Sequence, residues 1–174
     1  CIQAARQANY NHIGTEILDS CRFGSVSARK RVFTFFARPE IARKGQIRIP
    51  TPESTRLRMV QDILLPHRPE RTILPPEGWT TIQPRVEMSY VGPILIATRK
   101  GGNMGDRAYA VCGPAPTIRA TGRMPNGIYK KDGVFFTLTP REAARCLDID
   151  DTTDIGERWG DSLAQSYVGN SMSV

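Results

Sequence analysis

The sequence has few of the residues that build metal centres, disulfide frameworks or membrane spans. It holds four cysteines without a C-x-x-C pair and only two histidines, His12 and His67. A zinc site or a disulfide framework is therefore not expected, and a reducing compartment is the default. No apolar run approaches the roughly 20 residues that a membrane-spanning helix needs, and no signal-peptide pattern opens the chain. Because the first residue is Cys1 rather than Met, we expect the sequence to begin inside a longer reading frame or after processing.

Acidic residues are scarce in most of the chain. Residues 1–146 hold 23 Lys and Arg against 11 Asp and Glu, whereas residues 147–174 hold one Arg against six acids. A basic body of this size suits a polyanion such as nucleic acid, or an anionic membrane surface. A basic protein that simply stays soluble is the alternative that charge alone leaves open.

Short strands are predicted along much of the chain. Residues 12–19 alternate apolar and polar side chains, and residues 32–37 are β-branched and aromatic enough for a buried strand. The five prolines of residues 66–85 predict an irregular connection. Further strand-like stretches lie at 91–99, 107–111 and 117–120.

Helices are predicted at both ends of the chain and near residue 51. Residues 1–9 are typical of the tail of a helix. Thr51-Pro52-Glu53 is a good helix start, and that helix would run to about Leu64. Thr139-Pro140-Arg141-Glu142 is a capping box with proline at the first helical position. Residues 161–167 predict a short helix that closes on Gly169-Asn170.

Three stretches together resemble the last three conserved blocks of DNA cytosine-5 methyltransferases, in the same order. They are SVSARKRVFTFFAR (25–38), LTPREAARCLDID (138–150) and VGNSMSV (168–174), and GPAPTIRATG (113–122) resembles the approach to the second block. The resemblance implies an α/β fold: part of an S-adenosylmethionine-dependent, Rossmann-like methyltransferase domain with a small β-rich target-recognition domain inserted. Residues 1–38 and 136–174 would belong to the catalytic domain, and residues 39–135 would form the recognition domain.

The first block contains Ser27-x-Arg29-x-Arg31, where the family has Gln-x-Arg-x-Arg. Side chains at i and i+2 of an extended chain point to the same side. The resemblance implies that Arg31 contacts a flipped cytosine and that Arg29 holds a nearby phosphate. Arginine suits both roles because its fork stays charged and donates to carbonyl and phosphate oxygens. The alternative is a solvated basic turn before a strand.

The third block implies a site for S-adenosylmethionine. In the family, the Gly-Asn-Ser turn starts a helix that lines the cofactor pocket, so Asn170, Ser171 and Met172 are the predicted cofactor residues. Asn170 offers both a donor and an acceptor, and Ser171 offers a hydroxyl group. A Schellman-like helix stop at Gly169, followed by a frayed tail, is the alternative.

The catalytic nucleophile of the family is absent from the sequence. No Pro-Cys pair, cofactor-binding Gly-rich turn or Glu-Asn pair is present, and the four cysteines lie in other contexts. We therefore expect a C-terminal portion of the enzyme, either a truncated fragment or one chain of a split enzyme, that is inactive alone. Its partner would be an N-terminal half or second subunit with the catalytic cysteine. A non-enzymatic, basic DNA-binding module and, more weakly, a self-contained enzyme are the alternatives.

Double-stranded DNA is the expected substrate, and the middle of the chain offers candidate contacts. Arg99-Lys100 precedes the flexible turn Gly101-Gly102-Asn103, where backbone can approach phosphate. A solvated hairpin tip is the alternative there. The candidate DNA-binding residues are Arg29, Arg99, Lys100, Arg107 and Arg119. The resemblance also implies DNA methylation in the cytoplasm of a bacterial, archaeal or phage-infected cell, with no metal and no membrane.

Overall fold

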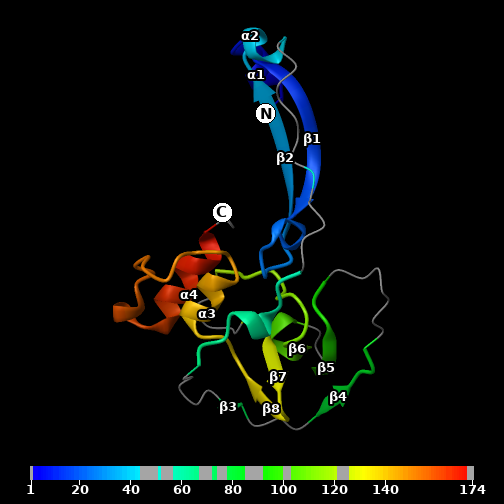
Figure 1. Ribbon diagram of the computed structural model, residues 1–174, viewed down its shortest axis with the longest axis vertical. Helices are drawn as coiled ribbons and strands as arrows, with labels where there is room; N and C mark the ends of the chain where they lie inside the picture. Colours follow the sequence, from blue (N-terminus) through cyan, green and yellow to red (C-terminus); the bar gives the residue numbers. More distant parts are fainter. Residues whose placement is uncertain are drawn as a thin grey trace.

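A long two-stranded ribbon rises from a body that combines a mixed sheet with two helices (Figure 1). The computed structural model describes residues 2–43, 51, 57–66, 72–73, 78–84, 92–99, 103–120 and 126–171. Among these residues, no helix has the length and apolar character needed to cross a membrane.

The ribbon consists of strands β1 (Asn11–Asp19) and β2 (Lys30–Ala37), which pair antiparallel. The short helices α1 (Ile2–Gln7) and α2 (Pro39–Ala42) lie at its far end, and a 3-10 turn at Ser20–Phe23 lies at its base (Figure 1). The predicted strands and the predicted N-terminal helix are thus confirmed.

The prediction that the second strand is buried is wrong. Ile17 and Val32 lie opposite each other on one face of the ribbon and are 68% and 66% exposed, and Phe33 on the other face is 40% exposed. Within the described part of the chain, β1 and β2 pair only with each other, so both outer edges are bare. The apolar pattern predicted the strand correctly, but the described residues leave Ile17, Val32 and Phe33 exposed.

The body contains a six-stranded sheet with the order β3-β8-β7-β6-β5-β4. All neighbours pair antiparallel except β6 and β7, which are parallel. Its strands are β3 (Thr72–Ile73), β4 (Trp79–Thr81), β5 (Leu95–Arg99), β6 (Arg107–Ala110), β7 (Ile128–Lys131) and β8 (Val134–Phe136).

Two of the predicted strands are confirmed in this sheet, as β5 and β6. The irregular connection predicted over residues 66–85 contains β3 and β4. The strand predicted over residues 117–120 is wrong. Polar groups of this segment bond to residues outside any strand pairing. The Arg119 N–H donates to Asn126 Oδ1 at 2.8 Å, and Thr117 Oγ1 donates to the Ala28 carbonyl oxygen.

Two helices from the end of the chain pack on the body. They are α3 (Pro140–Arg145) and α4 (Asp161–Asn170), which follows a 3-10 turn at Glu157–Trp159. The capping box of α3 is confirmed: the Glu142 N–H donates to Thr139 Oγ1 at 3.1 Å, and the Thr139 N–H donates to Glu142 Oε2 at 2.8 Å. The buried Glu142 carboxylate also accepts from the Leu65 N–H at 3.0 Å.

The helix predicted over residues 51–64 is wrong where it can be judged. Its start at 52–56 lies outside the described residues, and residues 57–64 form only a 3-10 turn at Val60–Asp62. The Val60 and Gln61 N–H groups donate to the carbonyl oxygens of Gly113 and Val111, both at 3.0 Å. Hydrogen bonds to a distant segment of the chain thus replace the helical hydrogen bonds that the helix propensity of these residues favours.

One hydrophobic core draws on all three parts of the predicted domain scheme. Val26 comes from the first part, Val60 and Tyr109 from the second, and Leu147 and Val168 from the third. A smaller cluster of Ala97, Ala108 and Ile128 lies within the sheet. The boundaries near residues 38 and 136 stay a prediction.

Glu142→Ala should destabilise the fold by about 2–4 kcal/mol, because it removes the acceptor for two backbone N–H groups in a buried place. Urea denaturation measures this difference. Glu157→Ala is the control, since Glu157 forms an exposed pair with Arg141 and should cost under about 1 kcal/mol. Equal losses in the two variants would contradict the structural role of Glu142.

Candidate functional site

The base of the ribbon is anchored to the end of α3. Ser25 Oγ and the Ser27 N–H both donate to the carbonyl oxygen of Cys146, at 2.9 and 3.0 Å. Ser25 and Ser27 are buried, 4% and 0% exposed. The first and second blocks of the predicted resemblance are therefore in direct contact.

The same loop also pairs with the segment that approaches the second block. The Ala28 N–H donates to the Ala115 carbonyl oxygen at 2.8 Å, and the Ala115 N–H donates to the Val26 carbonyl oxygen at 2.8 Å. Thr117 Oγ1 adds a bond to the Ala28 carbonyl oxygen at 3.0 Å. These bonds fix the backbone on which Arg29 begins.

Arg29 and Arg31 emerge from this anchored loop, close enough to repel each other. Burial lowers the pKa of Arg29, and the positive charge of Arg31 lowers it further. Arg29 Nη1 is buried and has no hydrogen-bond partner among the residues that the structure describes. Arg31 is exposed, and within the described part of the chain its Nη1 donates to the neighbouring Lys30 carbonyl oxygen, at 2.8 Å. A buried cationic donor without an acceptor beside a second cation is an arrangement that attracts an anion.

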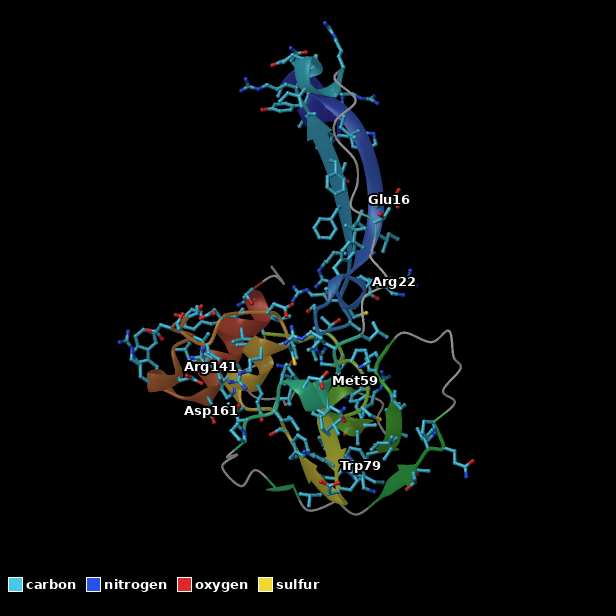
Figure 2. The ribbon with its side chains drawn as sticks, in the orientation of Figure 1. Glu16, Arg22, Met59, Trp79, Arg141 and Asp161 are labelled. Carbon is cyan, nitrogen blue, oxygen red and sulfur yellow. The ribbon has the colours of Figure 1, made fainter. Side chains whose placement is uncertain are left out.

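One further basic residue at this place was missed from the sequence. Arg22 lies in the 3-10 turn at the base of the ribbon and is exposed (Figure 2). Little in the sequence indicated a role for Arg22, because no basic residue adjoins it and it lies outside the resembling blocks. It adds to the positive charges of Arg29, Lys30 and Arg31 at the base of the ribbon.

The third block ends a helix in the described part of the chain. Gly169 and Asn170 are the last residues of α4, and Ser171 follows in an extended conformation. Ser171 Oγ donates to the Val168 carbonyl oxygen at 2.6 Å. The Schellman-like stop at Gly169 is wrong, because the helix runs past this residue. Met172, and any helix that starts after the turn, lie outside the described residues.

Gly169 allows α4 to touch the segment that follows Thr117. A Cβ atom at Gly169 would overlap the carbonyl group of Arg119 and the backbone nitrogen of Ala120, closer than any real contact. Only glycine fits such an approach of two backbones. The segment 117–120 therefore contacts Ala28 through Thr117 and the end of α4 through Arg119 and Ala120, so the first and third blocks both lie against the same stretch of chain.

A buried side-chain relay strengthens this contact. Asn126, 3% exposed, accepts from the Arg119 N–H through Oδ1 and donates to Gln165 Oε1 through Nδ2, both at 2.8 Å. Gln165 Nε2 in turn donates to the Leu138 carbonyl oxygen at 3.3 Å. Sequence reasoning missed Asn126, because the Pro-Asn-Gly run around it is equally typical of a solvated turn.

The predicted DNA contacts divide into separate places. Arg119 lies beside the end of α4, whereas Arg107 begins β6 and is exposed. Arg99, at the end of β5, donates from Nη2 and Nε to Asp106 Oδ1 at 2.7 and 3.0 Å, so an internal acid already balances its charge. Lys100 lies outside the described residues.

The buried thiols are poor nucleophiles. Burial, with a hydrogen bond to Asp19, raises the pKa of Cys21 to about 12. Burial and the negative charges of Glu142 and Asp148 also raise the pKa of Cys146. Both thiols are therefore protonated at neutral pH and cannot supply the thiolate that covalent catalysis needs. Among the described residues, no three His, Cys, Asp or Glu side chains gather as a metal site.

Solved methyltransferase structures share this fold. The chain is similar to S. pombe Dnmt2 methyltransferase, with a TM-score of 0.60 and 13% identity over 99% of this chain and 56% of that one. It is also similar to the Entamoeba histolytica methyltransferase EhMeth, with a TM-score of 0.60 and 15% identity over 98% of this chain and 52% of that one. No protein-family model and no curated protein sequence matches the chain.

These likenesses concern the fold. The α/β arrangement matches part of a methyltransferase domain, which confirms the predicted fold class. The chain spans about half the length of the solved structures that it matches.

Gly169→Ala should destabilise the protein by about 2–3 kcal/mol, because the added methyl group forces α4 away from Arg119 and Ala120. Thermal or urea unfolding measures this loss. Leu163→Ala, on an exposed face of the same helix, is the control and should cost under about 1 kcal/mol. A Gly169→Ala variant as stable as the wild type, as helix propensity alone would favour, would show that the backbones are not in contact.

Proposed function

We propose that this chain is the C-terminal portion of a DNA (cytosine-5) methyltransferase, and that the whole enzyme methylates a cytosine flipped out of duplex DNA. The observation that carries the proposal is the meeting of the three resembling blocks at one junction. The Ser25–Arg29 loop, the segment 113–120, the end of α3 and the end of α4 are held together by the bonds to Cys146 and the contact at Gly169. The methyltransferase fold of the solved neighbours supports it.

In this proposal, the arginines at the base of the ribbon hold the DNA. Arg31, exposed at the start of β2, contacts the flipped cytosine, and Arg29 holds a nearby phosphate through Nη1, which has no acceptor among the described residues. A flipped base must leave the stack at an energetic cost, so contacts to it and to its backbone are needed to keep it in place. Arg107 and Arg119 contact DNA further along the body, and Arg99 and Lys100 remain candidates there.

The proposed cofactor, S-adenosylmethionine, fits the polar groups at the end of α4. The Asn170 amide is exposed and makes no hydrogen bond to the described residues, and Ser171 retains the lone pairs of its hydroxyl oxygen. These groups suit the hydroxyl and carboxylate groups of such a ligand. The cofactor, when bound, supplies the methyl group, and Met172 would complete this side of its site.

The nucleophile comes from a second polypeptide or an N-terminal half in this proposal. The protonated state of Cys21 and Cys146 supports this part of the proposal, and the ribbon, which pairs with no other strand among the described residues, offers a place for the missing part to dock. Isolated two-stranded hairpins are marginally stable, and strands that are apolar on both faces are typical of the interior of an α/β sheet. The protonated thiols also suit the alternative, a non-enzymatic, basic DNA-binding module. Double-stranded DNA in the cytoplasm is the proposed partner in both cases.

The chain alone should transfer no methyl group to DNA, because its sequence lacks the Pro-Cys pair of the family and the buried thiols of Cys21 and Cys146 stay protonated. Incubation with labelled S-adenosylmethionine and a cytosine-rich duplex tests this expectation. The exposed Cys112 is removed in a parallel Cys112→Ser variant. Sustained incorporation by the wild type would contradict the proposal, and its loss in Cys112→Ser would identify the nucleophile that we had dismissed.

Arg29→Ala should weaken duplex binding and lower the salt dependence of log Kd by about one unit, as expected for one lost phosphate contact. Arg31→Ala should cost about 1–3 kcal/mol and act most strongly on cytosine-containing sites. Fluorescence anisotropy against salt concentration measures both effects. Arg158→Ala, an exposed arginine at the acidic end of the chain, is the control and should leave the slope unchanged. If Arg29→Ala also leaves the slope unchanged, the phosphate contact lies elsewhere.

A further inference from the structure

A hollow lies between the chain after α3 and the end of α4. It measures about 370 Å³, within the range of small-molecule sites. Its lining includes the apolar side chains of Ile149, Ile155 and Val168 and the aromatic rings of Trp159 and Tyr167. Of the described residues of the predicted cofactor site, Ser171 also lines this hollow and Asn170 does not.

Two half-exposed aromatic rings meet at a glycine in this hollow. Gly156 has a left-handed backbone with φ of 77°, and a Cβ atom there would lie 3.1 Å from Trp159 Cε3 and 3.3 Å from Tyr167 Cδ2. Trp159 and Tyr167 are nevertheless 58% and 54% exposed. Both rings are thus held against one backbone segment while keeping half of their surface available to a ligand.

The surroundings of the hollow select for a cation. Asp154 lines the hollow, and its Oδ1 accepts from the Gly156 N–H at 2.8 Å. Its other oxygen lies 3.4 Å from Arg158, in a pair whose side chains are both more than 60% exposed. Among the described residues that line the hollow, Asp154 is the one charged side chain. Nucleic acid is therefore disfavoured here, although its bases stack on aromatic rings elsewhere.

The indole ring already holds a cation within the chain. The Arg158 guanidinium carbon lies 4.4 Å from the centroid of the Trp159 ring. Aromatic faces attract cations through their quadrupole, and the attraction is strongest for cations that are weakly hydrated. Methyl groups around an ammonium centre lower its hydration and give it an apolar shell that fits the aliphatic floor of the hollow.

We propose that this hollow binds a methylated ammonium group, with Trp159 and Tyr167 as aromatic walls and with Asp154, whose exposed carboxylate is shared with Arg158, as the negative charge beside it. The group could be carried by a small molecule such as choline or by a trimethylated lysine side chain, because the chemistry of recognition is the same. The site is separate from the ribbon base and does not depend on the proposed methyltransferase function.

Tryptophan fluorescence tests the proposal directly, because the chain has only two tryptophans. In a Trp79→Phe background, Trp159 is the sole indole reporter. The probe is tetramethylammonium chloride, compared with ammonium chloride at equal ionic strength and with neutral neopentyl alcohol, which has the same shape. We expect a saturable change with tetramethylammonium and at least about tenfold weaker responses with the other two.

Three variants in the same background locate the site. Tyr167→Ala should weaken binding of tetramethylammonium about tenfold, and Asp154→Asn should weaken it severalfold. Tyr167→Phe keeps the ring and should bind as the parent does, which separates a lost ring from a disturbed fold. Leu163→Ala, on the same helix but outside the lining, is the matched control and should bind unchanged.

Several results would overturn the proposal. They are the absence of saturation, equal binding of neopentyl alcohol, and an unchanged affinity in Tyr167→Ala. Binding of S-adenosylmethionine without binding of tetramethylammonium would also overturn it, since the hollow would then belong to the cofactor site. Once tetramethylammonium binds, choline and a trimethyllysine peptide are titrated separately, and the tighter ligand identifies the natural source of the group.

Discussion

The carbonyl oxygen of Cys146 joins two parts of the chain that are 121 residues apart, and the arrangement of the candidate site depends on it. It accepts from Ser25 Oγ and from the Ser27 N–H, and so anchors the base of the ribbon to the end of α3. This anchor requires a helix that ends at a fixed place. The capping box of Thr139 and Glu142 provides it by fixing the start of α3 six residues earlier. A buried carboxylate that closes a helix start therefore sets the position of two arginines in another part of the chain.

The ribbon above this anchor has little packing of its own. Ile17 and Val32 on one face and Phe33 on the other expose more surface than a water-soluble hairpin needs to. A layer of side chains packed against one face of the ribbon would cover only part of this exposed apolar surface. Insertion into a larger sheet, with helices on both faces, would cover all of it, and this is the environment for which such strands are typical.

Local signals were read well from the sequence, and long-range ones were not. The capping box and the strands β1, β2, β5 and β6 could be predicted, because each depends on side chains only a few residues apart. The helix expected near residue 60 failed because Gly113 and Val111 take its backbone hydrogen bonds. The role of Gly169 could not be predicted either, because its reason is the backbone of Arg119, fifty residues earlier. For the candidate site, the sequence could indicate Arg29 and Arg31 but not the pairing of Arg99 with Asp106 or the relay through Asn126.

The charge environment of Arg29, which the fold determines, suits this residue to bind an anion. Burying a guanidinium group removes water from its donors, and the nearby charge of Arg31 opposes it as well, so the pKa of Arg29 is lowered. Arginine does not give up its proton under physiological conditions, so the cost remains in the folded protein as a charged group whose Nη1 has no acceptor among the described residues. Arg29 stays in this position despite the cost, because backbone hydrogen bonds hold the Ser25–Arg29 loop on both sides. An anion at Nη1 would remove the cost by supplying the missing acceptor and an opposite charge. The binding energy of such an anion would therefore include relief of a penalty that the protein bears without it.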